Sequence, residues 1–122
     1  MKFKLLFLLL FPIIIYSQES TLSALELKLA SEKNQTKKLA ILSDMVDVVF
    51  QNDMKKALEI AKKGVHLADQ LNDKNWQPKF YEMEGRMHAN LLQLDSATIF
   101  FEKAMKGYEE ISDVKGQAST SF

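Results

Sequence analysis

The stretches ALEIAKKGVHLADQL (residues 57–71) and ATIFFEKAMKGYEEI (residues 97–111) decide the fold of this chain. In the first stretch, apolar or small residues follow at steps of four, three, four and three, namely Ala57, Ala61, Gly64, Ala68 and Leu71. The second stretch lies forty residues later and repeats these steps, with Ala97, Phe101, Ala104, Tyr108 and Ile111. Such spacing puts all these side chains on one face of a helix. We therefore predict two amphipathic helices, related by an offset of forty residues, with their charged faces in water.

A second amphipathic segment precedes each of these helices. Its apolar residues are Leu42, Met45, Val46, Val49 and Phe50 in the first unit, and Phe80, Met83, Met87, Leu91 and Leu94 in the second. Asn52-Asp53 and Asp95-Ser96 mark the turns, because Asp and Ser side chains accept hydrogen bonds from free N–H groups at a helix start. Runs of alternating polarity, which indicate strands, are absent. We predict an all-α fold of antiparallel helix hairpins, stacked side by side as a short solenoid.

The chain divides into five segments on this interpretation. They are a signal peptide (1–17), an N-terminal capping helix and loop (18–35), a first repeat starting with Thr36 as N-cap (36–75), a second repeat (76–113), and the start of an incomplete third repeat (114–122). We expect Phe101, Tyr108 and Ile111 to be less well covered than in a longer stack, because a repeat cannot bury its apolar face alone. The alternative is a two-unit protein that self-associates through this C-terminal face.

The first seventeen residues have the order of a secretory signal peptide. Lys2 and Lys4 are followed by the apolar run of residues 5–15, and then by a polar stretch with a small residue at Ser17. A retained membrane anchor is the alternative, but the apolar run is shorter than the ~20 residues that span a bilayer. We expect an exported protein, periplasmic or extracytoplasmic, with no membrane span in the mature segment.

The composition argues against several functions. There is no cysteine, so a disulfide or a thiolate is excluded. Without Lys2 and Lys4, the 16 basic side chains fall to 14 against 16 acidic ones, which does not suit nucleic acid. His66 and His88 have no spacing typical of metal ligands, and Glu82 and Glu84 lie two apart and face different directions. We therefore predict no catalytic residue, no metal and no cofactor.

Seven residues match the pattern of a known repeat family. They are Ala97, Phe101 and Ala104 in the second helix of the second unit, Tyr81 and Gly85 in its first helix, and Ala57 and Gly64 in the first unit. The chain resembles the tetratricopeptide repeat family in these positions. It departs from the pattern at Ala61, Met45 and His88, and its period exceeds the usual ~34 residues. The resemblance implies helix pairs whose first helices line a concave surface.

Recognition of a protein or peptide partner is the function that this resemblance implies. Helix position gives five candidates for residues that face the groove, namely Asp44, Asp47, Arg86, Asn90 and Gln93. The alternative is an extracytoplasmic sensory fragment, since YEEISDVKG (residues 108–116) is similar to the sensory part of repeat-containing signalling proteins of Bacteroidetes-type bacteria. In those proteins a histidine kinase, cyclase or DNA-binding module follows, and no residue here belongs to such a module.

Overall fold

The computed structural model describes residues 21–121, and these residues contain helices and turns but no strand. Residues 21–31 are helical, and the helices that follow are α2 (Gln35–Val49), α3 (Met54–Leu71), α4 (Trp76–Asn90), α5 (Leu94–Glu110) and α6 (Val114–Thr120). The predicted all-α class is confirmed. The predicted signal peptide, residues 1–17, lies outside the described residues.

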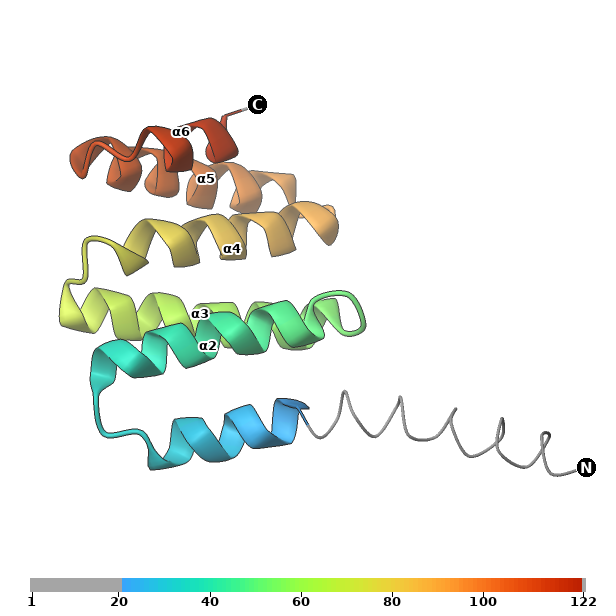
Figure 1. Cartoon of the computed structure of the whole chain (residues 1–122). Coiled ribbons are helices and arrows are strands. Elements are labelled where there is room, and N and C mark those ends of the chain that lie inside the picture. Colours follow the sequence, from blue (N-terminus) through green and yellow to red (C-terminus); the bar gives the residue numbers. More distant parts are fainter. Residues whose placement is uncertain (1–20, 122) are drawn as a thin grey trace, which may run out of the picture.

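The helices follow one another in space in the same order as in the chain (Figure 1). Each runs back along its predecessor, and α2 packs on α3, α3 on α4, α4 on α5, and α5 on α6. The helical residues 21–31 lie at one end of this stack and α6 lies at the other. The result is a stack of antiparallel helices that are joined by short turns.

The main core lies between α2, α3 and α4. Its buried side chains are Leu39, Ile41, Leu42, Met45, Val46, Val49, Ala57, Ile60, Ala61, Ala68, Phe80 and Met87. The Phe80 ring is fully buried and lies directly against Gly64, where an added Cβ would overlap the ring. Gly64 thus lets α3 and α4 approach closely. Trp76 begins α4 and packs on Phe80 with 5.5 Å between ring centroids, which fixes the start of the helix.

One turn geometry recurs along the stack. Asn72 and Ser112, forty residues apart, follow α3 and α5 in the left-handed region with φ of 50° and 57°. The next residue closes the helix end in both cases, since Asp73 N–H donates to Ala68 O and Asp113 N–H donates to Tyr108 O. The Asp73 and Asp113 carboxylates then accept from the backbone N–H three residues later, at the start of the next helix. The same residues therefore end one helix and begin the next.

Two of the predicted helix starts are wrong. The N-cap of α2 is Asn34, whose side chain accepts from Lys37 N–H, so that Thr36 already lies inside the helix. Helix α5 begins at Leu94 after Gln93, and Asp95 lies in its first turn, where a negative charge is favourable. The cap predicted at Asp53 is confirmed, since its side chain accepts from Lys56 N–H.

Two residues predicted for the apolar faces are exposed. Leu71, the last residue of α3, is 39% exposed, and Leu94, the first residue of α5, is 63% exposed. Both lie at a helix terminus, where the neighbouring helices no longer cover the stripe. The alanines of both stripes are buried as predicted, since Ala57, Ala61, Ala68, Ala97 and Ala104 are at most 4% exposed.

Candidate functional site

A small cleft lies between α2 and α4, which are the first helices of the two predicted hairpins. It encloses about 90 Å³ and is lined by Val46, Asp47 and Phe50 from α2, and by Met83, Arg86, Met87 and Asn90 from α4. The residues from α4 are spaced by three, one and three positions, which places them along one helix face. The lining is an apolar floor of Val46, Phe50 and the two methionines, with polar groups around it.

Three of the five predicted groove residues line this cleft together, namely Asp47, Arg86 and Asn90. Asp44 is exposed one turn before Asp47 and does not line it. Gln93 does not line this cleft either. Helix α4 ends at Asn90, and in the turn that follows, Gln93 Oε1 lies 2.7 Å from His88 Nδ1. Its side chain therefore takes part in a different contact.

The charges around the cleft are not balanced. Arg86 donates to Glu82 Oε1 at 2.7 Å, so its charge is compensated within α4. Asp44 and Asp47 form no ion pair within residues 21–121. Partial burial, together with the neighbouring Asp44 carboxylate, raises the pKa of Asp47 above its usual value of 3.8. The α2 side of the cleft is thus acidic without a counter-ion.

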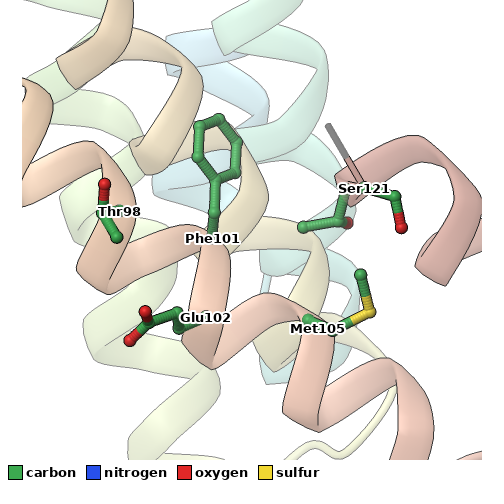
Figure 2. Close-up of a pocket in the computed structure, with 6 residues that line it drawn as sticks. Thr98, Phe101, Glu102, Met105 and Ser121 are labelled. Carbon is green, nitrogen blue, oxygen red and sulfur yellow. The ribbon is translucent and has the colours of Figure 1, made fainter.

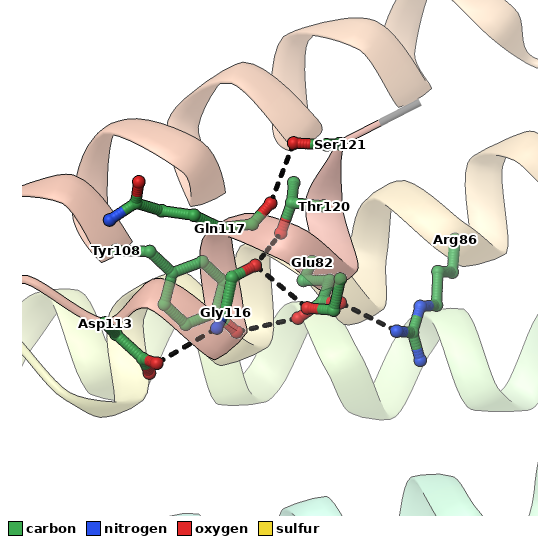
Figure 3. Close-up of polar contacts among 9 residues, drawn as sticks. Glu82, Arg86, Tyr108, Asp113, Gly116, Gln117, Thr120 and Ser121 are labelled. Atoms are coloured by element: carbon green, nitrogen blue, oxygen red, sulfur yellow. Dashed lines mark hydrogen bonds and ion pairs between the residues drawn. The ribbon is translucent and has the colours of Figure 1, made fainter.

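Glu82 is buried and joins α4 to α5 (Figure 3). Its Oε2 accepts from the Tyr108 hydroxyl at 2.7 Å, while Oε1 accepts from Arg86. Burial raises the pKa of the Tyr108 hydroxyl, and the adjacent Glu82 carboxylate raises it further. This contact could not be predicted from the sequence. The four-residue spacing of Glu82 and Arg86 was visible, but Tyr108 lies 26 positions later on another helix.

Glu84 and His88 form a second buried pair on α4. His88 Nε2 lies 3.3 Å from Glu84 Oε1, and the imidazole stacks on Phe100 of α5 with 5.4 Å between ring centroids. Desolvation by burial raises the pKa of Glu84, although His88, Lys62 and Lys103 oppose the shift. His88 thus packs between α4 and α5. Glu82 and Glu84 face different groups, as predicted, but their burial was not foreseen.

Tyr81, the aromatic residue of the repeat pattern, is half-buried beside α3. Its hydroxyl donates to Asp69 Oδ1 at 2.6 Å, and Gln77 Nε2 donates to the same oxygen at 3.2 Å. Burial and this hydrogen bond raise the pKa of Tyr81 to about 12. Tyr81 therefore ties α4 to the preceding helix, while Glu82 on the next position ties α4 to the following one.

A larger cleft of about 420 Å³ opens between α5 and the end of α6. Its lining residues are Thr98, Phe101, Glu102, Met105, Thr120 and Ser121, and Figure 2 shows four of them projecting from α5. Phe101 and Ile111 are half-buried, in keeping with incomplete cover at this end. Tyr108 was also expected to be poorly covered, and this prediction is wrong. Its side chain is 3% exposed because Gly116 of α6 lies against the ring.

A third cleft, of about 280 Å³, lies between the start of α4 and the end of α5. Lys74, Gln77, Tyr81, Lys103, Lys106, Gly107 and Glu110 line it. Lys103 lies over the Phe100 and Tyr81 rings at 5.2 and 5.7 Å. Three lysines and one glutamate line this cleft, so its charges are mixed.

The part of the chain that the structure describes holds no group of three or more His, Asp or Glu side chains arranged to bind a metal ion. Over the same residues, every helix is too short or too polar to cross a membrane. No model of a known protein family matches the chain, and no curated protein is significantly similar to it. The candidate site is therefore defined by its geometry alone.

Proposed function

We propose that this chain is an exported, non-catalytic scaffold of tetratricopeptide-like hairpins, which recognises a protein or peptide through the cleft between α2 and α4. The proposal rests chiefly on one observation. The first helices of two successive hairpins together line one open cleft, with an apolar floor and three polar groups at Asp47, Arg86 and Asn90. Apolar surface rimmed by a few polar groups is the composition of a recognition site.

The repeated turn supports the repeat interpretation. Helices α3 and α5 begin forty residues apart, at Met54 and Leu94, and both end in a left-handed turn, which also follows α4 at Leu92. Small residues also lie against aromatic rings at successive helix contacts, since Gly64 faces Phe80 and Gly85 faces Phe101. Repeats of this kind stack side by side and present their first helices on a common surface.

Binding fits the cleft better than catalysis does. Its side chains include carboxylate, guanidinium and amide groups, and Asp47 is the one group among them that could carry a proton, with no serine, threonine, histidine or lysine beside it in the lining to act as its partner. The buried Glu84 and His88 hydrogen-bond within the α4–α5 hairpin and do not line the cleft. The chemistry available at this surface is hydrogen bonding, ion pairing and apolar contact.

Site-specific photo-crosslinking in the envelope of the native host tests the proposal. A photoreactive amino acid replaces Asn90 in the cleft, or Gln70 as a matched exposed position on α3. We expect a discrete adduct from position 90 and none from position 70. Equal adducts from both positions, or none from either, would contradict recognition through this cleft. Intact mass of the exported protein tests the leader, because cleavage after Ser17 removes residues 1–17.

A further inference from the structure

The chemistry of the α2–α4 cleft indicates what kind of side chain it accepts. This step rests on the proposed recognition function. The cleft is small, about 90 Å³, which suits one side chain of a partner rather than a folded element or a cofactor. Its floor combines Phe50 with Met83 and Met87, and methionine side chains adapt to the shape of an apolar group.

The charges select among the side chains that would fit. Asp47 lines the cleft, Asp44 adds a second negative charge nearby, and neither has a cationic partner within residues 21–121. Arg86 is the one cation that lines this cleft, and Glu82 already holds it at 2.7 Å. An acidic side chain would have to compete with Glu82 for Arg86 while facing Asp44 and Asp47. A basic side chain meets an unpaired carboxylate instead.

We propose that the cleft binds a lysine or arginine side chain of a partner protein, with its cationic group against Asp47 and its aliphatic stem on Phe50 and Met83. Long basic side chains commonly cover apolar surface with their methylene groups while the charged end stays in water. The cleft offers this combination, because the carboxylate is at the edge and the apolar residues form the floor. Asp44 strengthens the negative potential without touching the ligand.

The electrostatic setting of Asp47, an exposed residue, agrees with this assignment. Partial desolvation and the Asp44 charge raise the pKa of Asp47, so the isolated protein holds this carboxylate in an unfavourable setting. A bound cation would lower that pKa again, because an opposite charge within a few ångströms favours the ionised form. The contact therefore relieves a repulsion that is already present between two acidic groups on α2.

An NMR titration with defined peptides tests the inference. The probes are three short peptides, acetyl-Gly-Ser-X-Ser-Gly-amide, in which X is arginine, norleucine or glutamate. Amide signals of the ¹⁵N-labelled protein are followed at residues 46–50 and 83–90. The variants are Asp47→Asn, which removes the cleft carboxylate, and Glu59→Gln, a matched charge removal at an exposed position of α3.

We expect the arginine peptide to move the signals of both segments and to bind about fivefold more tightly than the norleucine peptide, a ratio typical of a well-placed exposed ion pair. Asp47→Asn should abolish this difference, and Glu59→Gln should keep it. Equal binding of the norleucine or glutamate peptide would overturn the inference, as would shifts outside the cleft or none at all. If the inference fails in this way, adducts from position 90 in the crosslinking experiment would still support recognition of a partner through the cleft. Failure of the inference can therefore be told apart from failure of the proposed function.

Discussion

At the scale of single residues, close helix packing depends on positions that have no side chain. Gly64 lies under the fully buried Phe80 ring, whereas Gly85 lies beside the half-buried Phe101, where an added Cβ would meet the ring at 3.0 Å. Phe80 has no free space to move into, because protein interiors are packed at crystal-like density. Phe101 borders the open cleft between α5 and α6 and has room to shift. The two glycines should therefore differ in their tolerance of alanine.

Gly64→Ala should destabilise the protein by about 1–3 kcal/mol, because overpacking forces the core apart. Gly85→Ala should cost less than about 1 kcal/mol, since the gain in helix propensity offsets the tighter contact. Urea unfolding followed by circular dichroism measures both. Gly85→Leu should destabilise clearly, because its longer side chain does not fit the space beside Phe101. An unchanged midpoint in Gly64→Ala would show that α3 and α4 do not meet as described.

Glu84 makes stability depend on pH through its burial. Its pKa in the folded protein is raised above 4.5, chiefly by desolvation, so the folded state holds this proton more firmly than the unfolded state. The resulting stabilisation is fully present below the unfolded pKa and is lost as the pH rises through the folded pKa. Ionised Glu84 is therefore unfavourable for folding at neutral pH.

Glu84→Gln should consequently gain stability relative to wild type as the pH rises from about 4 to about 7. Thermal unfolding of both proteins across this range gives the difference in Tm at each pH. Glu59→Gln is the control, since its carboxylate is exposed on α3 and its difference should stay nearly constant. A Tm difference for Glu84→Gln that stays constant would show that the neighbouring cations offset the burial, and one that falls with rising pH would show that they outweigh it.

At the scale of elements, the contacts of α4 with α3 and with α5 each include a side-chain hydrogen bond in addition to apolar packing. Tyr81 links α4 to Asp69 of α3, and Tyr108 of α5 links back to Glu82 of α4. The second tie is the more buried, because Tyr108 is 3% and Glu82 is 8% exposed. Hydrogen bonds to a buried charged group contribute more than neutral ones on the surface.

Tyr108→Phe should therefore destabilise the α4–α5 hairpin by about 1–3 kcal/mol, because Glu82 Oε2 loses its donor in a buried place. Tyr81→Phe is the matched variant at the half-buried tie and should cost less. Chemical denaturation gives both values, and combining Tyr108→Phe with Glu82→Gln in a double-mutant cycle isolates the pairwise contribution. Independent, additive effects of the two changes would rule out the tie.

At the scale of the whole molecule, stability is unevenly distributed along the stack. The buried cluster of apolar side chains is drawn from α2, α3 and α4, and the partly buried residues that pack on it include Leu22, Leu25 and Leu29. Helix α6 has seven residues and packs only on α5 among the well-contacted helix pairs. In such a stack each helix depends on its neighbours, so the ends open more readily than the middle.

Amide hydrogen exchange should show this gradient. We expect the slowest exchange in α3 and α4, and exchange in α6 at least about tenfold faster, because local opening there requires breaking one interface only. Mass spectrometry of peptic fragments or NMR measures the rates. Uniform protection across residues 21–121 would indicate a single cooperative unit and would contradict the nearest-neighbour description.

Several features could be predicted from local sequence because they depend on neighbouring residues along one helix. The 4-3-4-3 spacing around Ala57 and Ala97 predicts amphipathic helices, and both alanines are buried. Asp53 caps α3 as its position suggested. The Thr36 cap and the exposure of Leu71 were misjudged, because helix ends depend on which backbone N–H groups are already satisfied and on where the adjacent helix stops.

The amino-acid sequence by itself determined the helical class, the forty-residue offset and the side on which each helix is apolar, because these follow from periodicity along the chain. Only the tertiary structure decided that Asp47, Arg86 and Asn90 share a cleft, that Gln93 turns to His88, and that Glu82 meets Tyr108. Helical periodicity specifies the face of a residue but not its partner on another helix. That partner depends on how far the helices are shifted along one another, which packing in three dimensions sets.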